Sequence, residues 1–155
     1  MKEFFLSLIP TGFDKTLMSI GASAGAISSF LFGEFSDSLI WLCVFLIIDF
    51  FTGWTAAWKR GELSSAVGTK GIIKKVLVVC IVILCHGLDV VSGLKLISLR
   101  EMAIFAFSLN EVVSILENID RLGFGGVIPD PIRKAVKALH DKQESDLKKI
   151  EDSLK

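Results

Sequence analysis

The sequence has little of the side-chain chemistry that enzymes and metal sites need. Only two histidines, His86 and His140, occur among 155 residues, and no nucleophile elbow, HExxH helix, phosphate-binding glycine loop or EF-hand loop is present. The three cysteines, Cys43, Cys80 and Cys85, lie in apolar runs without CxxC spacing, which argues against a disulfide framework or a zinc site. We therefore predict no enzyme activity, no cofactor and no metal.

The balance of charge argues against nucleic acid as a partner. Seventeen acidic and seventeen basic residues give a formal net charge of zero, and no basic stripe is interleaved with aromatic residues, so we expect no nucleic-acid partner. Eight of the acids and eight of the bases follow Leu116. The preceding part of the chain is therefore poor in charge, and its few charged residues gather between apolar blocks.

Long apolar blocks are what the sequence has in abundance. Hydrophobic residues make up 52% of the chain and the mean hydropathy is +0.61, which is too apolar for an ordinary soluble domain. A helix of about 20 apolar residues crosses the roughly 30 Å hydrocarbon core. We predict an all-α, multi-pass membrane protein with four transmembrane helices, or three if one stretch lies flat or re-enters. The predicted spans are 16–33, 38–58, 72–94 and 97–116.

Shorter segments flank this predicted transmembrane domain, which covers residues 16–118. Residues 1–15 are amphipathic and fit either a segment on the membrane surface or a frayed terminus. A Gly/Pro-rich linker over 119–131 leads to a charged cytoplasmic helix over 132–155. The apolar residues of this helix recur at three- and four-residue spacing, which fits a small bundle, a coiled coil or a solvated helix. They are Ile132, Val136, Leu139, Leu147, Ile150 and Leu154.

The span over 38–58 carries markers of its own orientation. Trp41 stands at one end, with Trp54 and Trp58 at the other, and tryptophan favours the membrane–water boundary. A predicted basic loop over 59–75 follows, and such loops stay on the cytoplasmic side. With four spans, both termini are then cytoplasmic. The basic residues of the loop are Lys59, Arg60, Lys70, Lys74 and Lys75.

Among the acids within the predicted spans, Asp49, Asp89 and Glu111 are the informative ones. An acid at membrane depth is costly unless it is neutralised, paired or hydrated, so each is a candidate functional residue. We expect no Lys or Arg at the depth of Asp49, whose carboxyl group should then be neutral, hydrogen-bonded or wet. Thr52 and Gly53 continue its helix face as a narrow, slightly polar stripe. The alternative is a structural role, in which nearby hydroxyl or backbone groups satisfy each acid.

Small residues recur every four positions in the first predicted span, at Gly21, Gly25, Ser29 and Gly33. Such a ladder lets another backbone approach closely, which is how helices associate in lipid. Packing within one subunit and packing between subunits both fit this pattern. Ala57 adds a further small residue to the face that carries the acid of the second span.

The polar and small residues of the later spans form an ordered series. The first block is Asp49-x-x-Thr52-Gly53-x-x-x-Ala57, Gly61-Glu-Leu-Ser64-Ser65 and Gly71-Ile-Ile-Lys74-Lys75. The second block is Glu111-x-x-Ser114-Ile115-Leu116-Glu117-Asn118, with Gly123 and Ile128-Pro129. Over about residues 40–135 this series resembles the signature of the toxin secretion/phage lysis holin family, whose third span often carries an acid where Asp89 stands.

The resemblance implies a small phage-type protein that forms homo-oligomers in the bacterial cytoplasmic membrane. Such proteins make lesions that depolarise the cell and release an endolysin or a large toxin, which is cargo rather than a tight partner. Four helices pack into a filled bundle, so a pore must form between subunits, and we expect Asp49 to stay neutral until assembly wets it. Two other functions fit the residues: a small oligomeric ion channel or transporter, and a non-pore antiholin or membrane scaffold.

Overall fold

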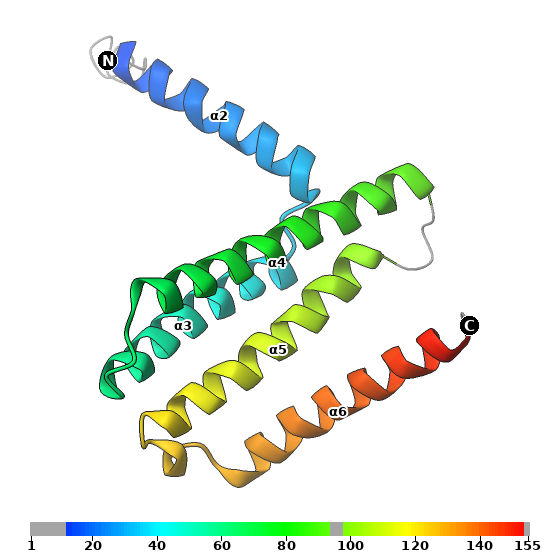
Figure 1. Cartoon of the computed structure of the whole chain (residues 1–155). Coiled ribbons are helices and arrows are strands. Elements are labelled where there is room, and N and C mark those ends of the chain that lie inside the picture. Colours follow the sequence, from blue (N-terminus) through cyan, green and yellow to red (C-terminus); the bar gives the residue numbers. More distant parts are fainter. Residues whose placement is uncertain (1–11, 94–97, 154–155) are drawn as a thin grey trace, which may run out of the picture. The chain divides into compact units, whose positions relative to one another are not determined.

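The computed structural model describes residues 12–93 and 98–153, and these residues form helices without β-strands (Figure 1). The predicted all-α class is therefore confirmed. The chain divides into two compact units, residues 1–35 and residues 36–155. Most of the predicted interfacial segment lies outside the described residues, and its last four residues form the start of the first described helix.

The first unit contains one described helix, α2 (Gly12–Phe32). Gly33 ends the helix in the left-handed conformation, with φ of 73°, and its backbone N–H donates to the carbonyl oxygen of Ser29 at 2.9 Å. Glycine favours this position because it lacks the Cβ that makes positive φ costly. The predicted small-residue ladder thus follows one side of α2 and finishes at its C-terminal cap.

Three described helices are long and apolar enough to cross a membrane, and all three belong to the second unit. They are α3 (Asp37–Lys59), α4 (Ser65–Ser92), whose apolar segment is Gly68–Ser92, and α5 (Leu99–Arg121). Helix α2, although 21 residues long, is not among them. The described helices therefore agree with the three-span form of the prediction, and the fourth span stays a prediction.

The connection between α3 and α4 is shorter than the sequence led us to expect. Helix α3 ends at Lys59 and α4 begins at Ser65, so most of the predicted loop over 59–75 is helical. Three of its five predicted basic residues, Lys70, Lys74 and Lys75, lie on α4. Lysine is a good helix former, so a cluster of lysines does not by itself mark a loop.

Helix α5 packs against both α3 and α4 and holds the second unit together (Figure 1). The fully buried side chains Leu42, Val82 and Ile104 come from α3, α4 and α5 in turn. Most other apolar side chains point outward; Phe51 is 63% exposed and Val91 is 86% exposed. A soluble domain rarely leaves so much apolar surface uncovered, whereas lipid chains would cover it.

The last helix, α6 (Asp130–Ser153), follows a short 3-10 turn, η1 (Gly125–Val127), and runs back beside α5 (Figure 1). Arg133 Nη1 donates to Asp120 Oδ2 at 2.8 Å, and His140 Nε2 lies 3.1 Å from Asn110 Oδ1. Polar contacts therefore join α6 to the C-terminal half of α5.

Only part of the predicted apolar stripe of the last helix is buried against the rest of the unit. Val136 is half-buried and faces a groove between α3 and α5, whereas Ile132 and Leu139 are 52% and 49% exposed. The side chains of Leu147 and Ile150, and the whole of Leu154, lie outside what the structure describes.

Candidate functional site: a buried lysine between two carboxylates

Each helix of the second unit's three-helix bundle contributes one charged residue at the same depth. Asp49 lies ten residues before the last residue of α3, Lys75 lies ten residues after the first residue of α4, and Glu111 lies ten residues before the last residue of α5. At 1.5 Å per residue, each is roughly 15 Å from its helix end. Because consecutive helices run in opposite directions, these three positions meet.

The Lys75 ammonium group lies between the two carboxylates. Its Nζ is 2.8 Å from Asp49 Oδ2 and 2.6 Å from Glu111 Oε2, and the three side chains are only 14% to 18% exposed. The expectation that no base lies at the depth of Asp49 was therefore wrong. The error came from placing Lys75 at the boundary between the predicted loop and the predicted span over 72–94, whereas α4 begins at Ser65 and carries Lys75 into the bundle.

Hydrogen bonds to Asn118 complete the carboxylate–lysine cluster. Asn118 Nδ2 donates to Asp49 Oδ1 at 3.0 Å and to Thr52 Oγ1 at 3.3 Å, and its Oδ1 accepts from Arg121 Nη1 at 3.1 Å. A Cβ on Gly53 would stand 3.3 Å from Asn118 Nδ2, so a glycine there lets the amide approach α3. Sequence reasoning missed Asn118 as a site residue, although it belongs to the second motif block.

The cluster is costly to disturb. A single ammonium group serves two carboxylates, so loss of Lys75 would leave two acids without a cation where water is scarce. A cavity of about 450 Å³ reaches Asp49, Lys75 and Glu111 from the end of the bundle at which α3 ends and α4 begins. The wall of the cavity contains both apolar and charged side chains, and the cavity has room for several water molecules.

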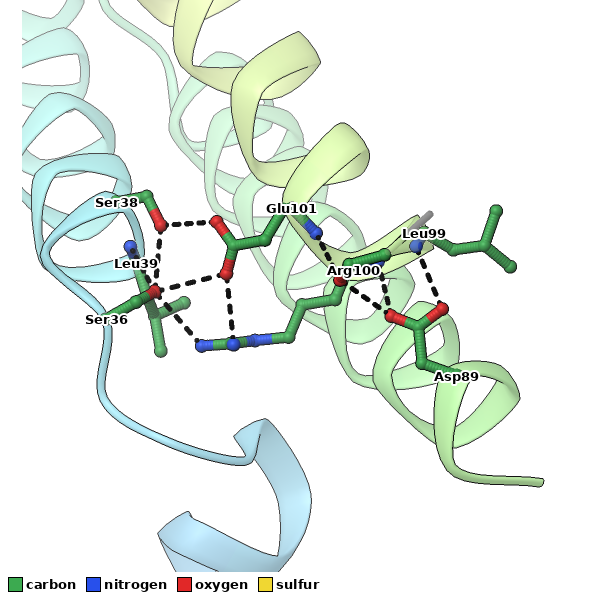
Figure 2. A network of polar contacts seen from close by, with 8 residues as sticks. Ser36, Ser38, Leu39, Asp89, Leu99, Arg100 and Glu101 are labelled. Carbon is green, nitrogen blue, oxygen red and sulfur yellow. Dashed lines mark hydrogen bonds and ion pairs between the residues drawn. The ribbon is translucent and has the colours of Figure 1, made fainter. Parts of the chain in front are cut away.

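Asp89 does not belong to this cluster, because it caps the N-terminus of α5 instead (Figure 2). Its carboxylate accepts hydrogen bonds from the backbone N–H groups of Leu99 and Arg100, at 2.8 and 3.0 Å, and from Ser98 Oγ at 2.9 Å. The first N–H groups of a helix have no partner within the helix, and a carboxylate there also complements the helix dipole. The geometry therefore supports the structural alternative for Asp89.

The same end of the bundle holds a second polar network, between α3 and α5 (Figure 2). Arg100, only 8% exposed, donates to Glu101 Oε1 at 3.1 Å and to Ser36 Oγ at 3.2 Å, while Ser38 Oγ donates to Glu101 Oε2 at 2.6 Å. Arg100 and Glu101 fall within the predicted span over 97–116, and in the structure they form an ion pair.

The remaining candidate residues are spread over the molecule. Ala57 is buried, the Lys59 ammonium group binds the carbonyl oxygen of Leu122, and Arg60 pairs with Glu62 at 2.9 Å. The small-residue ladder belongs to the other unit. Within the described part of the chain, no group of three His, Cys, Asp or Glu residues could hold a metal ion.

Fold and site together define a class: a multi-pass helical membrane protein with a buried charged cluster. Residues 26–141 match the bacteriophage holin family, and the chain belongs to that family of non-enzymatic membrane proteins. It is thus a multi-pass protein of the bacterial cytoplasmic membrane. This finding confirms the family that the motifs indicated.

Individual relatives agree with this assignment. The chain is 34% identical over 125 residues to an uncharacterised Listeria monocytogenes protein, covering 81% of this chain and 87% of the relative. An uncharacterised 14.9 kDa Clostridium perfringens protein is 33% identical over 121 residues, covering 78% and 90%. A probable holin of Bacillus phage phi105 is 34% identical over 95 residues, covering 61% and 69%. No solved structure matches the chain.

Replacing the buried lysine is predicted to destabilise the bundle strongly. Lys75→Gln removes the only cation that contacts the two carboxylates among the described residues, which should cost about 3–5 kcal/mol. Thermal unfolding in detergent and accumulation in the membrane measure the loss. Lys74→Gln is the matched control, because Lys74 makes no hydrogen bond or ion pair with the described residues. Equal stability of the two variants would contradict the ion-pair assignment.

Removing the cap of α5 is predicted to have a smaller effect. Asp89→Ala deletes the acceptor for the first N–H groups of α5, and loss of such a cap costs about 1 kcal/mol. Asp89→Asn keeps one acceptor oxygen and should lose less. Hydrogen exchange of the first turn of α5 reports the effect directly; unchanged exchange in Asp89→Ala would exclude the capping role.

Proposed function

We propose that this protein is a holin that oligomerises in the bacterial cytoplasmic membrane and forms lesions there. The lesions depolarise the cell and release an endolysin or a large toxin, leading to lysis. The observation that carries the proposal is membership of the bacteriophage holin family, supported by the similarity to the probable phage phi105 holin. The cargo passes through the lesion and is no tight partner.

The packing of the second unit supports a lesion built between subunits. Helix α5 packs against both α3 and α4, so a single bundle is filled rather than hollow. A folded enzyme needs an opening on the order of 30 Å, the length of a 20-residue helix. Helices about 10 Å across can surround such an opening only when several subunits contribute them.

The position of α6 supports contact with water on one side of the bundle. The exposed face of α6 carries Lys134, Lys137 and Asp141, and the helix lies along the C-terminal half of α5. Charged side chains are costly against lipid, so α6 can keep this position only beside water. A lumen between subunits would provide that water.

The proposed orientation follows the basic residues. Lys59 and Arg60 at the end of α3 would lie in the cytoplasm under the positive-inside rule. Helix α5 ends close by, because the Lys59 ammonium group binds the carbonyl oxygen of Leu122, so α6 would begin on the cytoplasmic side and would run from there beside the water of the lumen. A span formed by α2 would bring the N-terminus to the same side.

In the proposed mechanism, the intact carboxylate–lysine cluster is the state of the subunit before lesions form. Asp49 is held by Lys75 and Asn118, so the earlier picture of an unpartnered neutral acid is replaced by an ion-paired one. In the resting subunit these contacts hold α3, α4 and α5 together. Assembly would bring water to the cluster through its cavity, weaken the ion pairs and free helix faces for contact with other subunits.

Inducible expression in a bacterium tests the proposal. Membrane potential and release of a cytoplasmic reporter enzyme are followed together, and we expect both to be lost abruptly. Loss of potential alone would indicate an ion channel or transporter, and a harmless protein would indicate an antiholin or scaffold. In the same assay Asp49→Asn should shift the time of lysis, whereas Glu62→Gln, at a surface carboxylate 60% exposed, should not.

A further inference from the structure

The cavity beside the carboxylate–lysine cluster has more basic than acidic side chains in its wall. It measures about 450 Å³ and is lined by α3, α4, α5 and the loop after α3. Its wall also includes Gly68 in the first turn of α4, where the helix dipole is positive. The charged side chains that line this cavity are the four bases Arg60, Lys74, Lys75 and Arg121 and the two acids Asp49 and Glu111.

Lys74 is the side chain that most needs an external anion. Lys75 serves both buried carboxylates, but the neighbouring Lys74 makes no hydrogen bond or ion pair with the described residues. It nevertheless lies within the apolar segment Gly68–Ser92 of α4. A cation at membrane depth requires a counter-ion or water, and a long lysine side chain can extend toward the phosphate layer.

Both arginines of the cavity wall can take part. Arg60 pairs with Glu62 at 2.9 Å, and Arg121 pairs with Glu117 at 3.1 Å, and all four side chains are 44% to 60% exposed. Ion pairs between such exposed groups contribute little, so an incoming anion can share or replace them. Guanidinium groups are well suited to phosphate because their planar donors match two oxygens.

An apolar groove adjoins the cavity and indicates that an acyl chain is attached to the anion. The groove, about 550 Å³, runs between α3 and α4 and is lined by Leu46, Ile47 and Val79, among others. It shares Phe50 and Lys75 with the polar cavity. A basic pocket between transmembrane helices that continues into an apolar groove matches an anionic headgroup joined to an acyl chain.

We propose that each subunit binds one anionic phospholipid of the phosphatidylglycerol type at this place. The phosphodiester lies against Lys74, Arg60 and Arg121, and one acyl chain lies in the groove between α3 and α4. Inorganic phosphate has the same anion chemistry but lacks the chain. The proposal does not depend on lesion formation, because it concerns the isolated subunit.

Native mass spectrometry of the purified full chain in detergent tests this site. The probes are dioleoyl phosphatidylglycerol, phosphatidylcholine with the same chains, and inorganic phosphate. We expect one retained phosphatidylglycerol and no comparable retention of phosphatidylcholine. Lys74→Gln should weaken retention about fivefold, the contribution of one basic residue near an anionic surface, and Arg60→Gln should add a similar loss. Val79→Trp, which fills the groove, should weaken lipid retention as well.

Lys70→Gln is the matched control, because Lys70 is exposed on α4 one turn before Lys74 but does not line the cavity. Its lipid retention should equal that of the unmodified protein. Three results would overturn the proposal: equal retention of the two lipids, equal losses in Lys70→Gln and Lys74→Gln, or full displacement of the lipid by millimolar inorganic phosphate. The first two indicate non-specific attraction, and the third indicates a site for a free anion.

Discussion

The ammonium group of Lys75, held between Asp49 and Glu111, is the contact on which the arrangement of the second unit depends. Lipid provides no hydrophobic drive for helices to associate, so apolar surface alone cannot fix their register. An ion pair that is shielded from water can fix the register, because displacing any of its members leaves a charge uncompensated. A shift of α3, α4 or α5 by one helical turn, about 5.4 Å, would break the contacts at 2.8 and 2.6 Å.

Further polar contacts act at the other boundaries of the unit. Asp89 caps α5 and Arg100 bonds to Ser36, so the far end of the bundle is fixed as well. Arg133 joins α6 to Asp120 on α5, and this bond raises the pKa of the Arg133 guanidinium group. Between these ends the surface is largely apolar, as contact with lipid requires. A protein that must later rearrange is well served by few, specific contacts rather than a large core.

Much of this structure could be predicted from the sequence. Hydropathy gave the helical class and the three described spans, and the motif series gave the family. The partners of the acids could not be read from hydropathy, because a lysine beside a loop looks the same whether it faces water or the bundle. Only the start of α4 at Ser65 places Lys75 opposite Asp49, and only the start of α5 at Leu99 makes Asp89 a cap. Asn118 was hidden for the same reason, since its contact crosses from α5 to α3.

A double-mutant cycle between Asp49 and Lys75 tests the central claim most directly. The unfolding free energy is measured in lipid bicelles for Asp49→Asn, for Lys75→Gln and for the double variant. Contacting charged residues couple by about 0.5–3 kcal/mol, and the structure predicts a coupling of at least about 1 kcal/mol. The cycle of Asp49→Asn with Lys74→Gln should show none. Zero coupling between Asp49 and Lys75, within error, would contradict the account.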